Sequence, residues 1–187
     1  DTYLDAPINR DSVSAAFDVR LTPTLQWSVD GLYQNRKVNG SLFAISLADG
    51  VDTPSPVDGS QRLSQDFTYH QTTLGTVGSE RRWNIAQNWD MSLGYRRMRQ
   101  TRTNYDSFLT VIDNDGNYTD DLFRWYSKQN SDAANLTFTG KLQTGNIGHE
   151  LIFGTDIQSG ERLNGINFGA DTLGTSNLYD TVELADP

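Results

Sequence analysis

Alternation of apolar and polar residues recurs along this chain, whereas the periodicity of an amphipathic helix is nearly absent. Six segments carry the alternation, the third of them only weakly: residues 12–21, 25–36, 67–82, 89–96, 134–141 and 150–158. A period of two residues places every second side chain on the same face of a strand. The sequence therefore predicts an all-β, antiparallel fold of about six strands.

Each predicted strand has one apolar face and one polar face. In the first strand, Val13, Phe17 and Val19 share the apolar face. The polar faces carry many charges for a small protein, namely Asp18, Arg20, Asp30, Arg96 and Asp156. Such a sheet has an apolar face that needs a covering layer or a lipid environment.

The connections between the predicted strands alternate strictly between short and long. They are short at residues 22–24, 84–88 and 143–148, and long at 39–65, 102–121 and from 163 onward. A bacterial outer-membrane barrel has this arrangement, with short periplasmic turns, long extracellular loops and half-apolar strands of about ten residues. A soluble β-sandwich, whose apolar faces pack on a second sheet, is the alternative.

Aromatic residues favour the barrel interpretation. Trp27, Tyr33, Trp89 and Tyr95 lie near the ends of the apolar faces, where membrane barrels carry aromatic girdles. The charged opposite faces would then line a wet interior. We therefore expect a segment of a transmembrane β-barrel in a bacterial outer membrane.

Composition narrows the possible functions. The 187 residues include 15 Lys and Arg, 24 Asp and Glu and no Cys, with a net charge of −9. The negative charge argues against nucleic-acid binding, and the absence of cysteine excludes disulfides and Cys-based zinc sites. A mean hydropathy of −0.57 is the expected average of half-apolar strands and polar loops.

No catalytic or metal-binding pattern is present. His70 and His149 are the only histidines, too few for a three-His zinc site, and the phosphate-loop, dinucleotide and nucleophile-elbow motifs are missing. Residues 113–121 (DNDGNYTDD) resemble a calcium loop, but the glycine falls at position four rather than six. We expect a turn there, no enzyme, no cofactor and no resident metal.

Several segments carry a family resemblance. Residues 141–156 (KLQTGNIGHELIFGTD) and 89–97 (WDMSLGYRR) look like barrel strands of TonB-dependent ferric-siderophore receptors, and residues 25–34 fit another such strand. The stretch 177–180 (NLYD) is similar to an element that follows in the family, although Thr181 stands where proline is usual. The layout is most like that of hydroxamate-type receptors such as the ferrichrome receptor.

The resemblance implies a 22-stranded barrel with an N-terminal plug, and import of a ferric siderophore driven through the partner protein TonB. Twenty-two strands of about 9–11 residues need more than about 200 residues before loops are counted. We therefore expect residues 1–187 to be a partial barrel domain without plug, TonB-contacting segment or the remaining strands. Both ends, Asp1 and Pro187, have the character of interior positions.

The long loops are where the resemblance places ligand binding. Four aromatic residues fall in them and are candidates for the siderophore pocket: Phe43, Tyr105, Phe108 and Phe168. Packing of the loops against one another is the alternative role. Arg97, Arg99 and Arg102 form a basic cluster that could attract an anionic ligand or the phosphates of lipopolysaccharide. A soluble secreted carbohydrate-binding module remains the alternative function.

Overall fold

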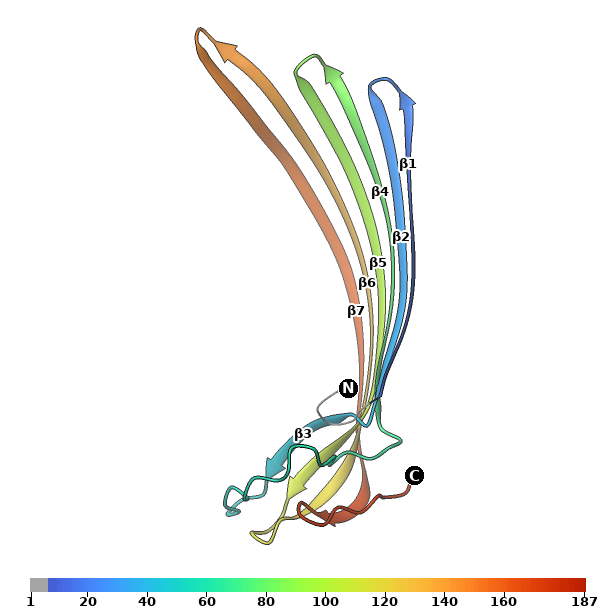
Figure 1. Cartoon of the computed structure of the whole chain (residues 1–187), viewed down its shortest axis with the longest axis vertical. Helices are drawn as coiled ribbons and strands as arrows, with labels where there is room; N and C mark the ends of the chain where they lie inside the picture. The colour runs from blue at the N-terminus through green and yellow to red at the C-terminus, as the bar shows by residue number, and fades with distance from the viewer. Residues whose placement is uncertain (1–6) are drawn as a thin grey trace.

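A computed structural model describes residues 7–187, except for the side chains of residues 43 and 166–170. The described residues form one seven-stranded sheet, long and strongly bent (Figure 1). Its strands are β1 (Ile8–Thr22), β2 (Leu25–Asn39), β3 (Leu42–Leu47), β4 (Tyr69–Ala86), β5 (Trp89–Val111), β6 (Asn117–Thr144) and β7 (Ile147–Asn177). The all-β prediction is confirmed.

Six strands form an antiparallel meander in the order β1-β2-β4-β5-β6-β7. Two-residue turns join β1 to β2, β4 to β5 and β6 to β7, and all three lie at one end of the sheet (Figure 1). The last turn uses Gly145 at a φ of 60°, a conformation that glycine adopts without the cost of a Cβ atom. The predicted short connections are confirmed.

The short strand β3 is the exception to the meander. It pairs in parallel with β5, from Leu42 opposite Ser107 to Leu47 opposite Val111. β4 begins at Tyr69, which is opposite Tyr105, so β5 has no β4 partner beyond that point. The chain leaving β2 keeps its direction and occupies the vacant edge, which saturates hydrogen-bonding groups that would otherwise be exposed.

Three strands are much longer than the alternation predicts. The prediction of long loops at residues 102–121 and beyond 163 is wrong, because β5, β6 and β7 continue through most of these residues. The ladder between β5 and β6 runs without a shift from Trp89 opposite Gly140 to Val111 opposite Tyr118. Residues such as 127–131 are polar on both faces, so only backbone pairing marks the strand there.

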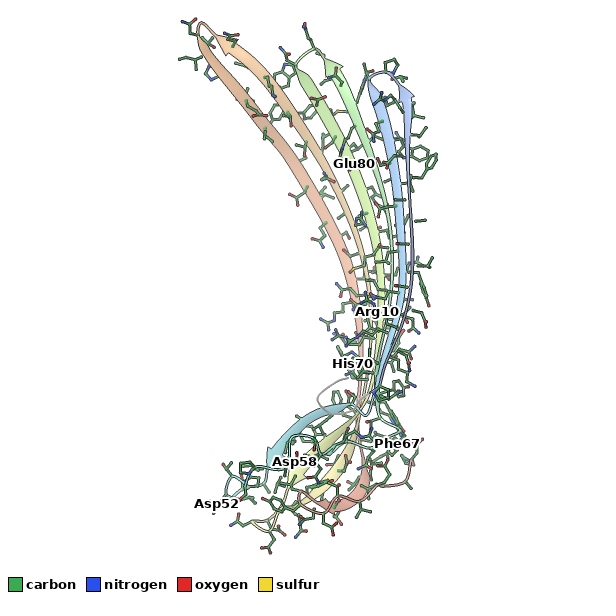
Figure 2. The ribbon with its side chains drawn as sticks, in the orientation of Figure 1. Arg10, Asp52, Asp58, Phe67, His70 and Glu80 are labelled. Carbon is green, nitrogen blue, oxygen red and sulfur yellow. The ribbon has the colours of Figure 1, made fainter. Side chains whose placement is uncertain are left out.

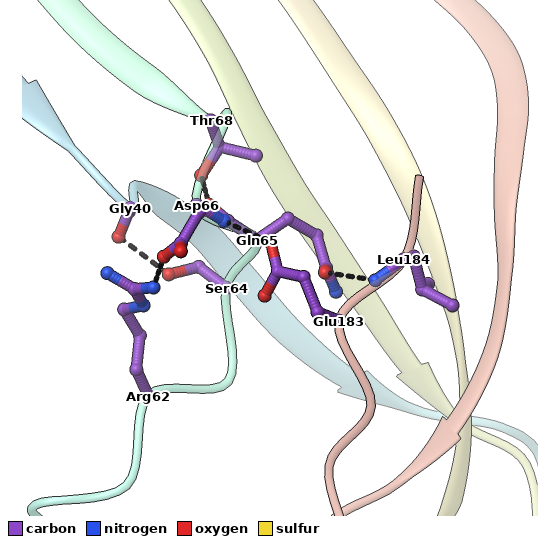
Figure 3. A network of polar contacts seen from close by, with 8 residues as sticks. All are labelled: Gly40, Arg62, Ser64, Gln65, Asp66, Thr68, Glu183 and Leu184. Carbon is purple, nitrogen blue, oxygen red and sulfur yellow. Dashed lines mark hydrogen bonds and ion pairs between the residues drawn. The ribbon is translucent and has the colours of Figure 1, made fainter. Parts of the chain in front are cut away.

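A small core forms at the end of the sheet opposite the turns. Leu109, Val111 and Tyr118 are fully buried there, under Leu63 of the 48–68 segment and Leu178 of the C-terminal segment. Polar contacts hold this cover in place (Figure 3): Gln65 accepts the Leu184 N–H at 2.8 Å, and Glu183 accepts the Asp66 N–H at 2.7 Å. The two segments therefore act as one cover over β5 and β6.

The acidic segment 113–121 begins with the predicted turn, at residues 113–116, and continues as the first residues of β6. Asp113 Oδ1 accepts the backbone N–H groups of Asp115 and Asn117, both at 3.0 Å, and Gly116 has a φ of 85°. These hydrogen bonds, with that of the Asn117 side chain first, hold the pKa of Asp113 below its ordinary value. The described residues contain no group of three or more acidic, histidine or cysteine side chains arranged for a metal ion.

The described part of the chain has no second sheet over its apolar face. The sandwich alternative is therefore not what this chain forms by itself. No helix among residues 7–187 is long and apolar enough to cross a membrane.

Candidate functional site

The strand register divides the sheet into two chemically different faces. The apolar face carries Phe17, Val29, Tyr95 and Ile157 in one cross-strand row. Large side chains on it are bare, with Phe17 61% and Ile157 73% exposed. Since a stable soluble sheet buries its apolar face, this face needs an apolar cover that the described residues do not supply.

Aromatic rings concentrate on the apolar face near the turns. Phe138 stacks on Phe153 with ring centroids 5.2 Å apart, and Trp89 meets Phe153 edge to face at 6.2 Å. The Trp89 ring lies directly over Gly140, where a Cβ atom would collide with it. Aromatic rings gathered at one level of a sheet are typical of the girdle at a membrane boundary.

The polar face carries compensated charges one residue along the strands from the row of Phe17 and Tyr95. Asp30 and Arg96 form an ion pair of 2.8 Å that passes over Gly78 on the intervening strand. An added Cβ at Gly78 would approach Asp30 Oδ1 to 2.6 Å and Arg96 Nη2 to 2.7 Å. The glycine therefore provides the space that lets charges two strands apart meet.

The structure places the four predicted aromatic residues in strands rather than in loops. Phe43 belongs to β3 and Phe168 to β7, and their side chains lie outside the described part. Tyr105 and Phe108 are three residues apart on the unbroken ladder of β5, so they point to opposite faces. Tyr105 is on the apolar side and Phe108 on the polar side, and they do not line one pocket.

Tyr105 is the centre of an aromatic and cationic cluster. Its ring stacks on Tyr69 at 5.6 Å and meets Phe67 edge to face at 6.1 Å. Arg124 lies over the same ring at 5.2 Å and also pairs with Asp171 at 3.1 Å. The Tyr105 hydroxyl donates to Asp186 at 3.1 Å. These contacts join four strands, β4 to β7, to the C-terminal segment, and they favour the alternative role of Tyr105 in packing.

The polar face has a different cluster at this level, which we name the arginine belt: Arg10, Arg36, Arg102 and Arg162. Arg10 is opposite Arg36, and Arg36 and Arg102 are both opposite Thr72. Figure 2 shows Arg10 nearer the covered end of the sheet and Glu80 nearer the turns. The basic cluster predicted from sequence divides between the faces, because Arg97 and Arg99 lie on the apolar side.

Trp125 connects two members of the belt. The Arg102 guanidinium lies 5.6 Å from the centre of its ring, and that of Arg162 lies 5.7 Å from it. Arg162 donates to Asn164 Oδ1 at 2.9 Å, and Arg10 Nη2 donates to the Gln34 side-chain oxygen at 2.7 Å in the orientation that satisfies both groups. Neutral partners thus orient the arginines without cancelling their charge.

The belt has an electrostatic effect on its surroundings. The ion pairs among the described residues are made by arginines outside the belt. No carboxylate in this part of the chain pairs with the four belt arginines. Burial lowers the pKa of His70, and the nearby charges of Arg102 and Arg36 lower it further, partly opposed by Asp106. This part of the polar face is therefore electropositive although the chain is acidic.

Sequence reasoning missed Arg10, Trp125 and Arg162. Their strands extend beyond the alternating segments, so the cross-strand row could not be assembled without the register. Arg36 is the last residue of the predicted strand segment 25–36 and shares the polar face of Asp30, but nothing in the sequence indicated that Arg10 lies opposite it.

Several solved structures of bacterial receptors contain a part that is similar to this chain. BauA, the ferric preacinetobactin receptor of Acinetobacter baumannii, is similar to this chain with a TM-score of 0.81 at 16% identity. The match covers 100% of this chain and 30% of that receptor. The outer-membrane ferripyoverdine receptor of Pseudomonas aeruginosa, solved with ferripyoverdine bound, matches with a TM-score of 0.79 at 17% identity over 94% of this chain and 24% of its own.

A third similar structure is the ferric-catecholate import receptor Fiu of Escherichia coli K12, with a TM-score of 0.74 at 18% identity over 98% of this chain and 29% of its own. No family model and no curated protein sequence matches the chain. The fold is therefore that of a part of the barrel of TonB-dependent siderophore receptors. The chain spans less than a third of the length of these receptors.

Proposed function

We propose that this chain is a partial barrel domain of a bacterial outer-membrane receptor that binds ferric siderophores and imports them. In this proposal residues 1–187 form part of the wall, and a plug domain and further strands complete the receptor. The transported ligand is the ferric chelate, and transport involves no catalytic step by these residues.

One observation carries the proposal: a single sheet with a bare apolar face on one side and a charged face on the other. Three two-residue turns lie at one end of it and the covered, irregular segments at the other. Lipid would contact the apolar face, and the charged face would line the wet interior. The turn end would be periplasmic, which places the arginine belt and Phe108 toward the extracellular mouth.

The partners follow from the same arrangement. TonB would act through a plug-side segment, since energy must reach the ligand site from the periplasm, and lipopolysaccharide would surround the outer rim of the apolar face. Of the predicted aromatic residues, Phe108 is the one whose described side chain belongs to the interior face. Phe43 and Phe168 remain candidates for ligand contact.

Uptake of radioactive iron tests the proposal. The intact receptor is expressed in a bacterium that lacks its own siderophore receptors, and ferric siderophores are supplied with and without a functional TonB system. We expect energy-dependent uptake of at least one ferric siderophore, lost when TonB is deleted. Absence of uptake of every ferric siderophore by a correctly inserted receptor would contradict the proposal.

A further inference from the structure

The arginine belt is energetically unfavourable by itself. Arg10 and Arg36 are directly opposite each other, and like charges in a cross-strand pair destabilise a sheet. Arg102 is in the same row, separated from Arg36 by Thr72. On the same face, Asp106 is two rows further along β5 and is buried, where its Oδ2 already accepts the Asn104 amide at 2.6 Å. The row therefore lacks a counter-charge among the described residues.

The distance of the belt from the turn end indicates which part of a barrel it would occupy. Arg102 lies 13 residues beyond Trp89 on β5, about 43 Å along the strand at ~3.3 Å per residue. With a strand tilt of about 40°, this is about 33 Å along a barrel axis, beyond an apolar band about 25 Å tall. Opposite-face residues at that level, such as Thr101 and Lys128, are polar too. The belt thus belongs to the outer vestibule and not to the membrane-spanning wall.

Resting on the proposed function, we infer that the arginine belt selects ferric chelates with a net negative charge over neutral ones. A tris-catecholate complex of Fe³⁺ carries a net negative charge, and a tris-hydroxamate complex is neutral. Guanidinium groups bind anionic oxygens by charge-assisted and often bidentate hydrogen bonds. Trp125 lies beside Arg102 and Arg162, so its indole is close to the groups that would bind the chelate.

This inference favours a different class of ligand from that of the hydroxamate-type receptors whose layout the sequence resembles. A neutral chelate would leave the belt uncompensated, and its desolvation would oppose binding. An anionic chelate supplies the missing charge at the level of the polar face where four arginines lie without a carboxylate partner among the described residues. Electropositive mouths also raise the association rate of anionic ligands.

Binding to the intact, purified receptor tests the inference, with a ferric tris-catecholate and a ferric tris-hydroxamate as probes and intrinsic tryptophan fluorescence as the signal. In the double variant Arg102→Gln/Arg162→Gln, we expect affinity for the catecholate to fall at least about tenfold and affinity for the hydroxamate to stay unchanged. Raising the salt concentration should weaken catecholate binding to the unmodified receptor. Arg99→Gln, on the opposite face, is the matched control and should change neither affinity.

The outcomes separate this inference from the proposed function. The charge selectivity would be overturned if the receptor bound the hydroxamate more tightly than the catecholate. It would also be overturned if Arg102→Gln/Arg162→Gln bound the catecholate as tightly as the unmodified receptor. Either result would leave the proposal of ferric-chelate import intact. Binding of neither probe by a receptor that shows the mobility of a folded barrel on electrophoresis would count against both. A second double variant, Arg102→Lys/Arg162→Lys, should retain most of the catecholate affinity, since it keeps the charge; a loss as large as with glutamine would overturn the electrostatic argument.

Discussion

Single residues in this sheet decide which charges can meet. Gly78 is the clearest case, because the Asp30–Arg96 ion pair crosses the backbone at that position. Both side chains are about half exposed within this chain, so the pair contributes at most about 1 kcal/mol. The glycine is thus required by its neighbours across the sheet rather than by its own backbone conformation.

Replacing Gly78 by alanine should therefore weaken the ion pair. The added Cβ would displace the flexible ends of Asp30 and Arg96, and we expect a loss of up to about 1 kcal/mol in unfolding free energy, measured by urea titration of the intact barrel in detergent. The same substitution at Gly75, where no atom lies within 4 Å of the added Cβ, is the control. An equal effect at both sites would show that the ion pair is irrelevant.

The hairpin turns show how a residue sets the geometry of an element. In the β6–β7 turn, Gly145 has a φ of 60° and open space around it, so its role is conformational. We expect Gly145→Ala to cost about 1–2 kcal/mol through left-handed strain alone. Gly148→Ala, in equally open space but without a positive φ, should be nearly neutral in the same unfolding assay. A neutral Gly145→Ala would mean that the turn changes conformation.

The cover over β5 and β6 should respond to pH through Asp120. This carboxyl is fully buried, and it accepts hydrogen bonds from Gln65 at 2.8 Å and Ser107 at 3.1 Å. Burial raises its pKa above the ordinary value of 3.8; the two hydrogen bonds oppose this rise, and the nearby charges of Asp121 and Glu183 add to it. Because the folded state holds the proton more tightly than the unfolded state, stability of the cover is greatest below pH 3.8 and is lost as pH rises through the raised pKa.

Hydrogen exchange of residues 61–68 measures this effect. Protection should decrease as pH rises from the ordinary aspartate range through the raised pKa, after correction for the intrinsic exchange rate. Asp120→Asn keeps an acceptor oxygen for Gln65 and Ser107 but cannot ionise, so its protection should be independent of pH in this window. The same pH dependence in the variant would assign the effect to another group, such as Glu183.

Elements were predictable from sequence only where their two faces differ. Alternation located the strand segments around Phe17, Trp27 and Leu93 and their register at the short turns, because lipid-facing and interior positions demand opposite chemistry. It failed along residues 99–104 and 127–132, where both faces are polar and the ladder continues without a hydrophobic signal. Three of the belt arginines, Arg10, Arg102 and Arg162, lie outside the alternating segments. The sequence therefore could not show that Arg10, Arg36 and Arg102 share one row with Arg162 beside it.

At the scale of the whole molecule, charge is distributed by level. An acidic row, with Asp18, Glu80 and Asp156, lies on the polar face within the band of exposed apolar residues, and the arginine belt lies toward the covered end. The net charge of −9 averages over both levels. Within the band Glu80 is paired with Arg82, and Asp30 in the neighbouring row with Arg96, whereas no carboxylate among the described residues pairs with the belt arginines. An interior wall of this kind would attract anions at the mouth.

The assignment of the two faces yields a test with adjacent residues of one strand. Val29 is on the apolar face between Phe17 and Ser79, and Ser28 is on the polar face between Asp18 and Glu80. If lipid covers the apolar face, Val29→Arg should cost about 2–4 kcal/mol of folding into a bilayer. Ser28→Arg places the same charge between two carboxylates and should be tolerated.

Assembly of the intact receptor into lipid vesicles, followed by the electrophoretic mobility of the folded barrel, measures both variants under identical conditions. A strong defect for Val29→Arg alone would establish the apolar face as the lipid-facing side. Equal tolerance of both substitutions would mean that the face is wet, and equal defects would mean that a second protein layer or tight packing constrains both sides. Because the two positions share a strand and a level, depth and local propensity cannot account for a difference between them.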